Sequence, residues 1–328
     1  MASKKAKIVA SVAVVLVMIV AVLAITQPKE QKTIGNDKRL ESIPTSRVKV
    51  TVAEDSNKPV VHSSLWKTPV PMPGPVNTAG AEDSPFMTPN GTWFFFFFTP
   101  DVTVPPEKQL IDGVTGIWWS QKVGDNWSDP EKVILSDDVS LDGAEFVLGT
   151  TMWFASVRQG NYGEIDVFTA EYEDGKWRDV KNAGEQLNVD YDIGEFHLTS
   201  DGQTMYFHTG NLSSGDDMDL WITHKSTSGW SAPEKVAGVD TDANEGYPYI
   251  TPDGNELWFT GWSKLGYPGP AVFRSVKLSN GSWGPSEEII SNFAGESTMD
   301  DAGNIYFVHH FYTGGTMIEA DIYVAYRQ

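Results

Sequence analysis

The sequence predicts an all-β protein built from one unit that repeats five times along most of the chain. In each unit a tight turn with a glycine precedes an aromatic-rich β-strand, as at Gly254 before Trp258. A second marker, an apolar residue followed by an aromatic one, recurs about every fifty residues. A period of about fifty with four short strands in each unit is typical of a β-propeller. We therefore expect a five-bladed β-propeller over residues 63–328.

These markers occupy corresponding places in the units. The turn glycines are Gly91, Gly149, Gly202, Gly254 and Gly303, and the second belongs to a shortened turn. The apolar–aromatic pairs of the third strands are Ile117-Trp118, Val167-Phe168, Leu220-Trp221, Val272-Phe273 and Ile322-Tyr323. A tryptophan opens the fourth strand of four units, as Trp127, Trp177, Trp230 and Trp283. Self-similarity of this kind indicates a repeat fold.

The fifth unit lacks a fourth strand, because the sequence ends at Gln328 directly after the third one. A short run that also has a tryptophan near its start, Leu65–Val70 with Trp66, precedes the first unit. We expect this N-terminal strand to complete the last blade and so to close the ring. Closure removes the open strand edges that otherwise invite aggregation.

The first residues of the chain differ from the rest. Three lysines precede an uncharged run, Ile8–Ile25, that is just long enough to span the hydrocarbon core of a membrane. Positive charge before such a run predicts a cytoplasmic N-terminus. We therefore predict a signal anchor, one transmembrane helix within residues 1–26. The alternative is a signal peptide cleaved near Ala24, which would leave a secreted protein.

Residues 27–62 are polar and charged without a hydrophobic period, so we expect a linker, with a short strand at Arg47–Val52. The predicted organisation is thus an anchor over residues 1–26, a linker over 27–62 and a propeller over 63–328. The propeller would lie outside the cytoplasm, at the cell surface or in the periplasm, and the N-terminal helix would hold it to the membrane.

Composition excludes several classes of function. The chain has no cysteine, so it has no disulfide and no thiolate metal site. Its net charge of −20 excludes non-specific nucleic-acid binding, because the neutralisation of phosphates needs Lys and Arg. We expect no nucleic-acid partner, and a protein or carbohydrate ligand whose identity the sequence does not give.

Two signatures match a known family. The fourth unit contains Asn244–Pro248, then Thr251–Gly254, then Leu257–Phe259. The Asp of an Asp–apolar–aromatic signature is present as Asp166, Asp219 and Asp321 and is replaced by Gly116 and Ala271. With these residues, the chain resembles the WD40-like β-propeller repeats of the PD40 type, which are related to the TolB propeller. This resemblance implies a propeller that serves mainly as a binding or scaffold domain.

Glutamates recur at the start of the predicted innermost strands. Glu195 and Glu296 lie seven residues before their turn glycines, and Glu145 joins them if the shortened turn is a local deletion. Glu82 and Glu245 fall two residues earlier in their units. Because side chains alternate along a strand, all five should point to one face. By the resemblance, this position lies near one mouth of the central channel, so we predict a ring of carboxylates there.

The ring can be interpreted in three ways. Each glutamate could accept hydrogen bonds from nearby backbone, which would be a structural role. The carboxylates could instead bind hydroxyl groups or a cation, and Ca²⁺ suits oxygen ligands. The third interpretation is catalysis, since some five-bladed propellers are furanosidase-like glycoside hydrolases with acidic residues on their inner strands. Glycoside hydrolysis needs two carboxyl groups roughly 5–9.5 Å apart, one of them with a raised pKa.

Loops between second and third strands should lie over the same rim. They contribute Arg158 and Trp262 to the predicted ligand-binding residues, beside Glu82, Glu145, Glu195, Glu245 and Glu296. If the protein is an enzyme, Glu145, Glu195 and Glu296 are the catalytic candidates. His309 and His310 are adjacent and would face opposite ways on a strand, so we expect no metal site from them.

We therefore predict a membrane-tethered, extracytoplasmic β-propeller that acts as a ligand- or protein-binding or scaffold domain, without a required cofactor. The alternative is a glycoside hydrolase of the five-bladed furanosidase-like type that uses the carboxylates of the rim.

Overall fold

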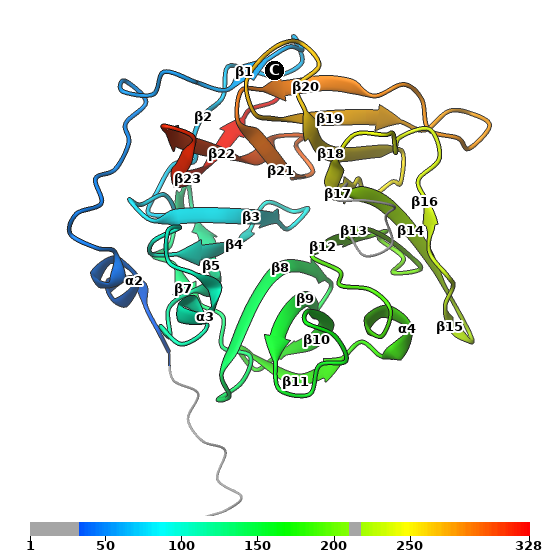
Figure 1. The fold of residues 1–328 in the computed structure, drawn as a ribbon, viewed down its shortest axis with the longest axis horizontal. Coiled ribbons are helices and arrows are strands. Elements are labelled where there is room, and N and C mark those ends of the chain that lie inside the picture. The colour runs from blue at the N-terminus through cyan, green and yellow to red at the C-terminus, as the bar shows by residue number, and fades with distance from the viewer. Residues whose placement is uncertain (1–32, 210–217) are drawn as a thin grey trace, which may run out of the picture. The chain divides into compact units, whose positions relative to one another are not determined.

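The structure is a computed structural model that describes residues 33–209 and 218–328. Within the compact unit Ile34–Gln328 the chain is mostly β-sheet, with short helices between strands (Figure 1). The predicted all-β class is confirmed. In the two described ranges no helix has the length and apolar character needed to cross a membrane. The transmembrane helix predicted within residues 1–26 lies outside these ranges and stays a prediction.

The strands form four hydrogen-bonded sheets, the largest of which joins two sets of strands through one parallel pair, Ala320 with Ala81. Along the chain they fall into five groups of three consecutive antiparallel strands. The first strands are β3 (Ala81–Met87), β8 (Ser140–Leu148), β12 (Glu195–Leu198), β17 (Glu245–Ile250) and β21 (Ala294–Met299). The second strands are β4 (Trp93–Thr99), β9 (Thr151–Arg158), β13 (Thr204–Thr209), β18 (Glu256–Trp262) and β22 (Ile305–Thr313). The third strands are β5 (Gly116–Val123), β10 (Asp166–Glu173), β14 (Asp219–Ser226), β19 (Pro270–Val276) and β23 (Thr316–Ala325).

Shorter elements complete the groups. Outer strands are β6 (Asn126–Trp127) and β7 (Glu131–Lys132) on β5, β11 (Lys176–Asn182) on β10, β15 (Gly229–Trp230) and β16 (Glu234–Lys235) on β14, and β20 (Glu287–Ser291) on β19. The N-terminal strands are β1 (Val60–Val61), which pairs with β20, and β2 (Val70–Pro71), which pairs with β23. The described helices are α2 (Asn36–Ser42), α3 (Pro106–Gln109) and α4 (Glu185–Asn188).

The first strands lie together at the centre of the view in Figure 1. Each contacts the first strands of two neighbouring groups, in the order β3, β8, β12, β17, β21 and back to β3. Second and third strands lie farther out, and apolar side chains fill the space between groups. The run Phe94–Phe98 of β4, for example, is almost entirely buried, which is what a strand covered on both faces requires.

Four of the five first strands contain a β-bulge at the same place. The register shifts after Asp83 in β3, Gly143 in β8, Gly246 in β17 and Gly295 in β21. The next residue in each strand has a positive φ: 43° at Ser84, 53° at Ala144, 52° at Tyr247 and 52° at Glu296. A bulge re-aims side chains and often lies beside a functional site.

The last group takes its outer strand from the other end of the chain. Val70 and Pro71 of β2 pair with Val324 and Tyr323 of β23. Trp66 forms an isolated bridge with Arg327 and is 2% exposed. Its indole N–H donates to the carbonyl of Gly303 at 2.8 Å.

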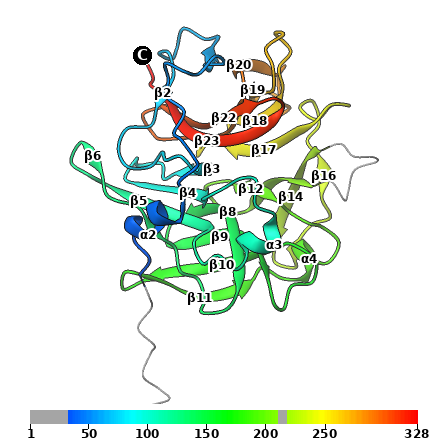
Figure 2. The same ribbon diagram turned by 60° about the vertical axis from the view of Figure 1, so that its left-hand side comes forward.

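Residues 34–62, which the sequence predicts to be linker, pack against the strands. Arg39 of α2 is fully buried, and its guanidinium pairs with Glu82 of β3 at 2.6 Å. It lies over the rings of Phe98 and Trp118, and Figure 2 shows α2 beside β5. A buried arginine with a carboxylate partner explains why this polar segment is ordered, since an unpaired charge could not be buried.

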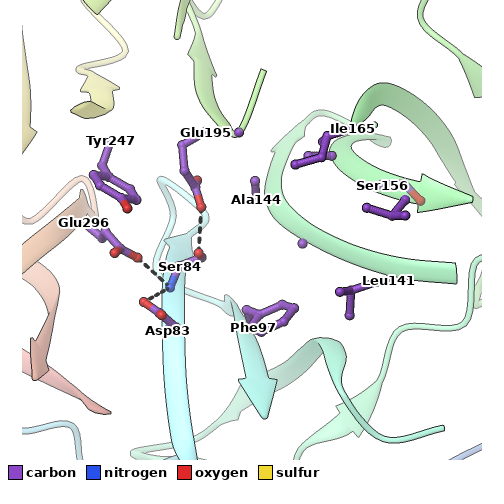
Figure 3. A pocket seen from close by; sticks show the side chains of 14 residues that line it. Asp83, Ser84, Phe97, Leu141, Ala144, Ser156, Ile165, Glu195, Tyr247 and Glu296 are labelled. Carbon is purple, nitrogen blue, oxygen red and sulfur yellow. Dashed lines mark hydrogen bonds between the residues drawn. The ribbon is translucent and has the colours of Figure 1, made fainter. Parts of the chain in front are cut away.

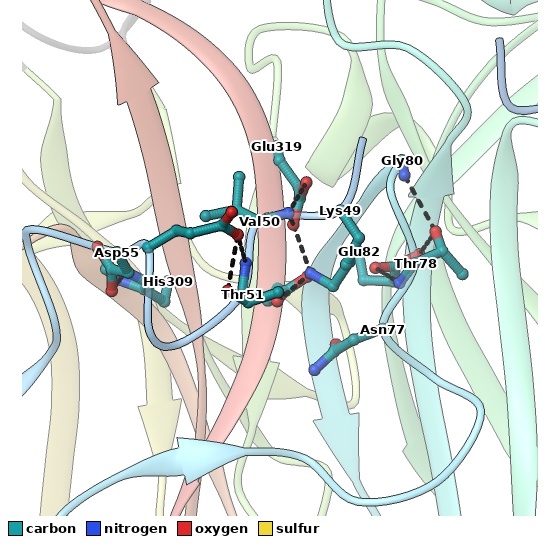
Figure 4. A network of polar contacts seen from close by, with 12 residues as sticks. Lys49, Val50, Thr51, Asp55, Asn77, Thr78, Gly80, Glu82, His309 and Glu319 are labelled. Carbon is teal, nitrogen blue, oxygen red and sulfur yellow. Dashed lines mark hydrogen bonds and ion pairs between the residues drawn. The ribbon is translucent and has the colours of Figure 1, made fainter. Parts of the chain in front are cut away.

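The next segment crosses the last group without the short strand expected at Arg47–Val52. Lys49 forms ion pairs with Glu319 and Asp321 of β23, and Asp55 pairs with His309 of β22 (Figure 4). Ion pairs therefore fix this polar segment against the last group. A polar, charged composition is not enough to identify a segment as a free linker.

Candidate functional site

An open pocket of about 280 Å³ lies where the first strands converge, and we call it the axial pocket (Figure 3). All five first strands contribute to it. Its lining includes Asp83, Ser84, Phe97, Leu141, Ala144, Ser156, Ile165, Glu195, Tyr247 and Glu296. One side is acidic and the other, mostly from β8 and its neighbours, is apolar. None of these lining residues is Lys or Arg.

Ser84 connects two of the predicted glutamates. Its hydroxyl donates to Glu195 Oε1 at 2.7 Å, and its backbone N–H donates to Glu296 Oε2 at 3.1 Å. The bulge in β3 places the backbone of Ser84 in the left-handed region, with a φ of 43°. Carboxylates from β12 and β21 thereby meet on one residue of β3. Glu195 and Glu296 thus each accept a hydrogen bond from a residue of a different strand group.

The environment shifts the protonation of both carboxyl groups. Burial raises the pKa of Glu195 to about 8, and the nearby charge of Asp83 acts in the same direction. Burial also raises the pKa of Glu296 well above its usual value, with further contributions from Asp83 and Glu195. Like charges crowded into one pocket without a cation favour the neutral acid. At neutral pH the pocket therefore contains at least one carboxyl group, that of Glu195, that can donate a proton.

A small chamber of about 40 Å³ adjoins the axial pocket and shares Ser84, Glu195, Tyr247 and Glu296 with it. We call it the inner chamber. Glu145 lines it and is 5% exposed. Neither oxygen of Glu145 has a hydrogen-bond partner among the described residues. Burial raises the pKa of this carboxyl group well above its usual value and so favours the neutral acid.

Two of the predicted glutamates have a structural role. Glu82 accepts hydrogen bonds from the N–H and hydroxyl of Thr78, at 2.9 and 2.6 Å. Glu245 accepts the same pair from Thr241, also at 2.9 and 2.6 Å. In both units the threonine lies four residues before the glutamate. Glu82 also pairs with Arg39 of the N-terminal segment, and neither carboxylate lines the axial pocket.

The two predicted rim residues also lie apart from the axial pocket. Arg158 pairs with Asp142 at 2.6 Å and lies over the rings of Phe154 and Phe168. Trp262 is at the end of β18 and is 59% exposed. Neither is among the lining residues.

Among the described residues, one group of side chains has the spacing of a metal site. One ligand atom each from Asp83, Glu296 and His310 lie within 4.8 Å of one another. The two adjacent histidines face opposite ways, as expected, because His309 pairs with Asp55 instead. Oxygen ligands suit Ca²⁺, whereas an added imidazole also suits transition metals. Sequence reasoning missed this group because its members lie in different strands.

Sequence reasoning also missed Asp83, Ser84 and Tyr247, although a signal for two of them exists. Ser84 and Tyr247 lie seven residues before their turn glycines, at the position that Glu195 and Glu296 occupy. In the second unit the bulge assigns this position to Ala144. Glu145 is therefore one residue further along, which explains why it faces the inner chamber and does not join the other two.

The arrangement supports two kinds of chemistry. Carboxylates and the hydroxyls of Ser84 and Tyr247 can bind the hydroxyl groups of a ligand, and the apolar side can contact its C–H surface. A carboxyl group whose pKa is near 8, such as that of Glu195, can also act as a general acid at neutral pH.

No family model matches the chain, and no curated protein matches it. Solved structures do. An endo-arabinase from Bacteroides thetaiotaomicron is 12% identical, with 78% of this chain and 96% of that chain covered and a TM-score of 0.50. The catalytic domain of a Coprinopsis cinerea GH62 α-L-arabinofuranosidase is 9% identical, with coverages of 79% and 95% and a TM-score of 0.51. TolB from Acinetobacter baumannii is 15% identical, with coverages of 72% and 51% and a TM-score of 0.43.

Identities this low show the fold alone. The similarity to the first two proteins, together with the groups of antiparallel strands, confirms that this chain has a β-propeller fold.

Proposed function

We propose that this chain is a membrane-tethered, extracytoplasmic five-bladed β-propeller that binds a carbohydrate ligand in the axial pocket. The observation that carries the proposal is the convergence of Glu195 and Glu296 on Ser84. Glu82, by contrast, bonds to Thr78 of the preceding loop and to the buried guanidinium of Arg39. Glu195 and Glu296 instead face a pocket and have raised pKa values. Such unfavourable crowding is typical of functional sites.

Several observations support five blades and a closed ring. The five first strands contact one another in cyclic order, and β2 pairs with β23 next to the bridge between Trp66 and Arg327. We also infer that the repeats are of the PD40 type, on the signatures that the sequence contains.

The chemistry of the pocket favours a carbohydrate over an apolar ligand. Glu195, Glu296 and Asp83 offer acceptors for hydroxyl groups, and Phe97 and Leu141 offer an apolar surface for one face of a sugar ring. A cation on Asp83, Glu296 and His310 would offset their mutual repulsion, and Ca²⁺ is the ion that the oxygen ligands favour. A protein partner on the outer surface would be compatible with the same fold.

A second candidate function is glycoside hydrolysis, and one observation favours it. Burial holds Glu195 as a proton donor at neutral pH, while the Asp83 carboxyl group lies at the opposite side of Ser84. A general acid with a raised pKa next to a second carboxyl group is the pattern of a glycosidase. The endo-arabinase and the α-L-arabinofuranosidase with similar folds are enzymes by name, and a shared fold does not transfer their activity.

A glycan array and a hydrolysis screen with the purified full chain test both functions. We expect at least one glycan to bind, with Glu195→Gln abolishing binding and Glu82→Gln, the matched control, preserving it in the folded fraction. Release of sugar by the parent but not by Glu195→Gln would favour the hydrolase. Repeating the binding assay with millimolar Ca²⁺ tests whether a cation at Asp83, Glu296 and His310 supports glycan binding. If no glycan binds to a folded chain, the carbohydrate proposal is wrong.

A further inference from the structure

Three polar side chains of the inner chamber have atoms that lack hydrogen-bond partners among the described residues. These atoms are both carboxyl oxygens of Glu145, the hydroxyl of Ser297 and Nε2 of His197. All three residues line the chamber and are buried, with 5%, 7% and 9% of their surface exposed. Folded proteins leave few buried polar atoms without partners, because such atoms have lost their hydrogen bonds to water. The three side chains therefore indicate that the chamber receives a polar group.

The hydrogen-bonding capacity of these atoms limits what that group can be. The backbone N–H of Ile250 donates to His197 Nδ1 at 3.4 Å, which assigns the ring proton to Nε2. Burial lowers the pKa of His197 to about 3, so the imidazole is neutral. Its Nε2 is then a donor and has no lone pair for a metal ion. Glu145 and Ser297, by contrast, present three oxygens that can accept hydrogen bonds from an entering group.

The ionisable groups around the two cavities favour a cation. Asp83, Glu195 and Glu296 line the axial pocket, and Glu145 lines the inner chamber beside it. None of the described residues that line either cavity is Lys or Arg. Burial raises the pKa of Glu145, and the charges of Glu195 and Asp83 act in the same direction. A cationic group would offset the repulsion among these carboxyl groups.

A metal ion does not account for Glu145. Among the described residues, the group with the spacing of a metal site consists of Asp83, Glu296 and His310, and Glu145 is not part of it. A metal ion needs several ligand atoms at about 2.0–2.6 Å. An ammonium group instead carries three N–H donors and forms hydrogen bonds of about 2.7–2.9 Å to carboxylates. It therefore suits the acceptors of Glu145 and Ser297 better than a metal ion does.

The sizes of the two cavities indicate how such a group would be attached. The inner chamber, of about 40 Å³, holds groups no larger than a few water molecules, and an ammonium group is about as large as one. The axial pocket is much larger, at about 280 Å³. The two cavities share Ser84, Glu195, Tyr247 and Glu296, so one ligand can extend from the larger space into the smaller.

We propose that the axial pocket binds an amino sugar whose ammonium group enters the inner chamber. The ammonium donates to the carboxylate of Glu145 and to the hydroxyl oxygen of Ser297, and the sugar ring lies beside Glu195 and Glu296. Glu145 is ionised in the complex, so its proton passes to solvent on binding. This inference rests on the proposed carbohydrate function and names the class of sugar.

The test is isothermal titration of the purified full chain in a buffer without divalent cations, at about pH 6.5, where amines of this kind are protonated. The probes are glucosamine, galactosamine and mannosamine, each compared with its neutral parent hexose. Glu145→Gln removes the charge and keeps the shape of the side chain. Glu173→Gln, at an exposed position of β10, is the matched control. Melting temperatures establish that each variant is folded.

We expect at least one amino hexose to bind about tenfold or more tightly than its parent hexose. Glu145→Gln should remove this advantage without weakening the parent hexose, and Glu173→Gln should preserve it. Amino hexoses that bind no more tightly than their parents, or an advantage that survives in Glu145→Gln, would overturn the inference and leave the carbohydrate proposal intact. Absence of binding by every sugar of the set would also overturn it, and the glycan array would then decide the carbohydrate proposal by itself.

Discussion

The hydroxyl of Ser84 donates to Glu195 Oε1 at 2.7 Å, although Ser84 is on β3 and Glu195 is on β12. The two strands belong to different groups, and β8 lies between them in the order of contacts. Among the described residues, Glu82 and Glu245 have no such contact with another first strand: each accepts hydrogen bonds from a threonine four residues earlier, and Glu82 also pairs with Arg39. The contact between Ser84 and Glu195 distinguishes the glutamates that line a pocket from those that stabilise the fold.

Arg39 should be essential for stability. Arg39→Met leaves Glu82 as a buried carboxylate without its cation, so it should lower the free energy of unfolding by about 3–5 kcal/mol. Arg47→Met is the control, because the pair of Arg47 with Asp101 is partly exposed and should contribute about 0–1 kcal/mol. Urea unfolding followed by tryptophan fluorescence measures both. Equal losses in the two variants would contradict a buried ion pair under α2.

Trp66 should stabilise the whole propeller, because it joins the two ends of the chain. Trp66→Ala removes a buried indole and its hydrogen bond to Gly303, which should cost about 3–5 kcal/mol. Trp262→Ala, at an exposed position, should change stability by no more than about 0.5 kcal/mol. The measurement is the melting temperature of each variant. A Trp66→Ala variant that melts with the parent would count against closure by the N-terminal strand.

Much of the fold could be predicted because each unit repeats the same local signals. The turn glycines, the aromatic pairs of the third strands and the early Trp66 all depend on short-range patterns. The structure has third strands at the aromatic pairs and an isolated bridge to Arg327 at Trp66. The packing of residues 34–62 could not be predicted. It depends on Arg39 meeting Glu82, 43 residues away in sequence, and composition alone makes that segment look like a linker.

The candidate site was predicted in part. Glu195 and Glu296 could be found because they share one offset from their turn glycines, and both line the axial pocket. Alternation along a strand failed as a guide to the others because the bulges interrupt it. Alignment on the turn glycines grouped Glu145 with Glu195 on the condition of a local deletion, and the bulge places Ala144 at that position instead. Asp83 was missed because nothing in the sequence shows that β3 and β21 meet.

The predicted anchor has a direct test, motivated by the lysines before Ile8–Ile25. The full chain should stay in the membrane fraction after high-salt and alkaline washes, because an apolar run of this length inserts into the hydrocarbon core. N-terminal sequencing of the washed protein should find residue 1 or 2. Recovery of a soluble form that begins near Ile25 would instead identify a cleaved signal peptide.

Glu145 should be replaceable by glutamine at neutral pH. Burial raises its pKa well above the value in the unfolded chain, so the folded state holds a neutral acid that glutamine mimics. A raised pKa also means that stability is lost as pH rises toward the folded-state value. Glu145→Gln should therefore melt with the parent at pH 4, below the unfolded-state pKa of about 4.3, and above the parent at pH 7. A variant that melts lower at both pH values would show that the ionised form has a partner.

Glu195 should have the same direction of pH dependence. Its pKa is about 4.3 in an unfolded chain and about 8 in the folded one. The folded state therefore binds more protons between these values, and stability falls as pH rises through them. The advantage of Glu195→Gln over the parent should be absent near pH 4 and largest above pH 8.

The central claim is that Glu195 and Glu296 serve a ligand site, whereas Glu82 serves the fold. Its most direct test measures, on the same preparations, the melting temperature at pH 8 and the binding of the glycan found in the screen. We predict that Glu195→Gln and Glu296→Gln melt at or above the parent and lose glycan binding. We predict that Glu82→Gln melts well below the parent and, while folded, retains binding. Glu195→Gln and Glu296→Gln variants that melt as low as Glu82→Gln and still bind the glycan would contradict the account.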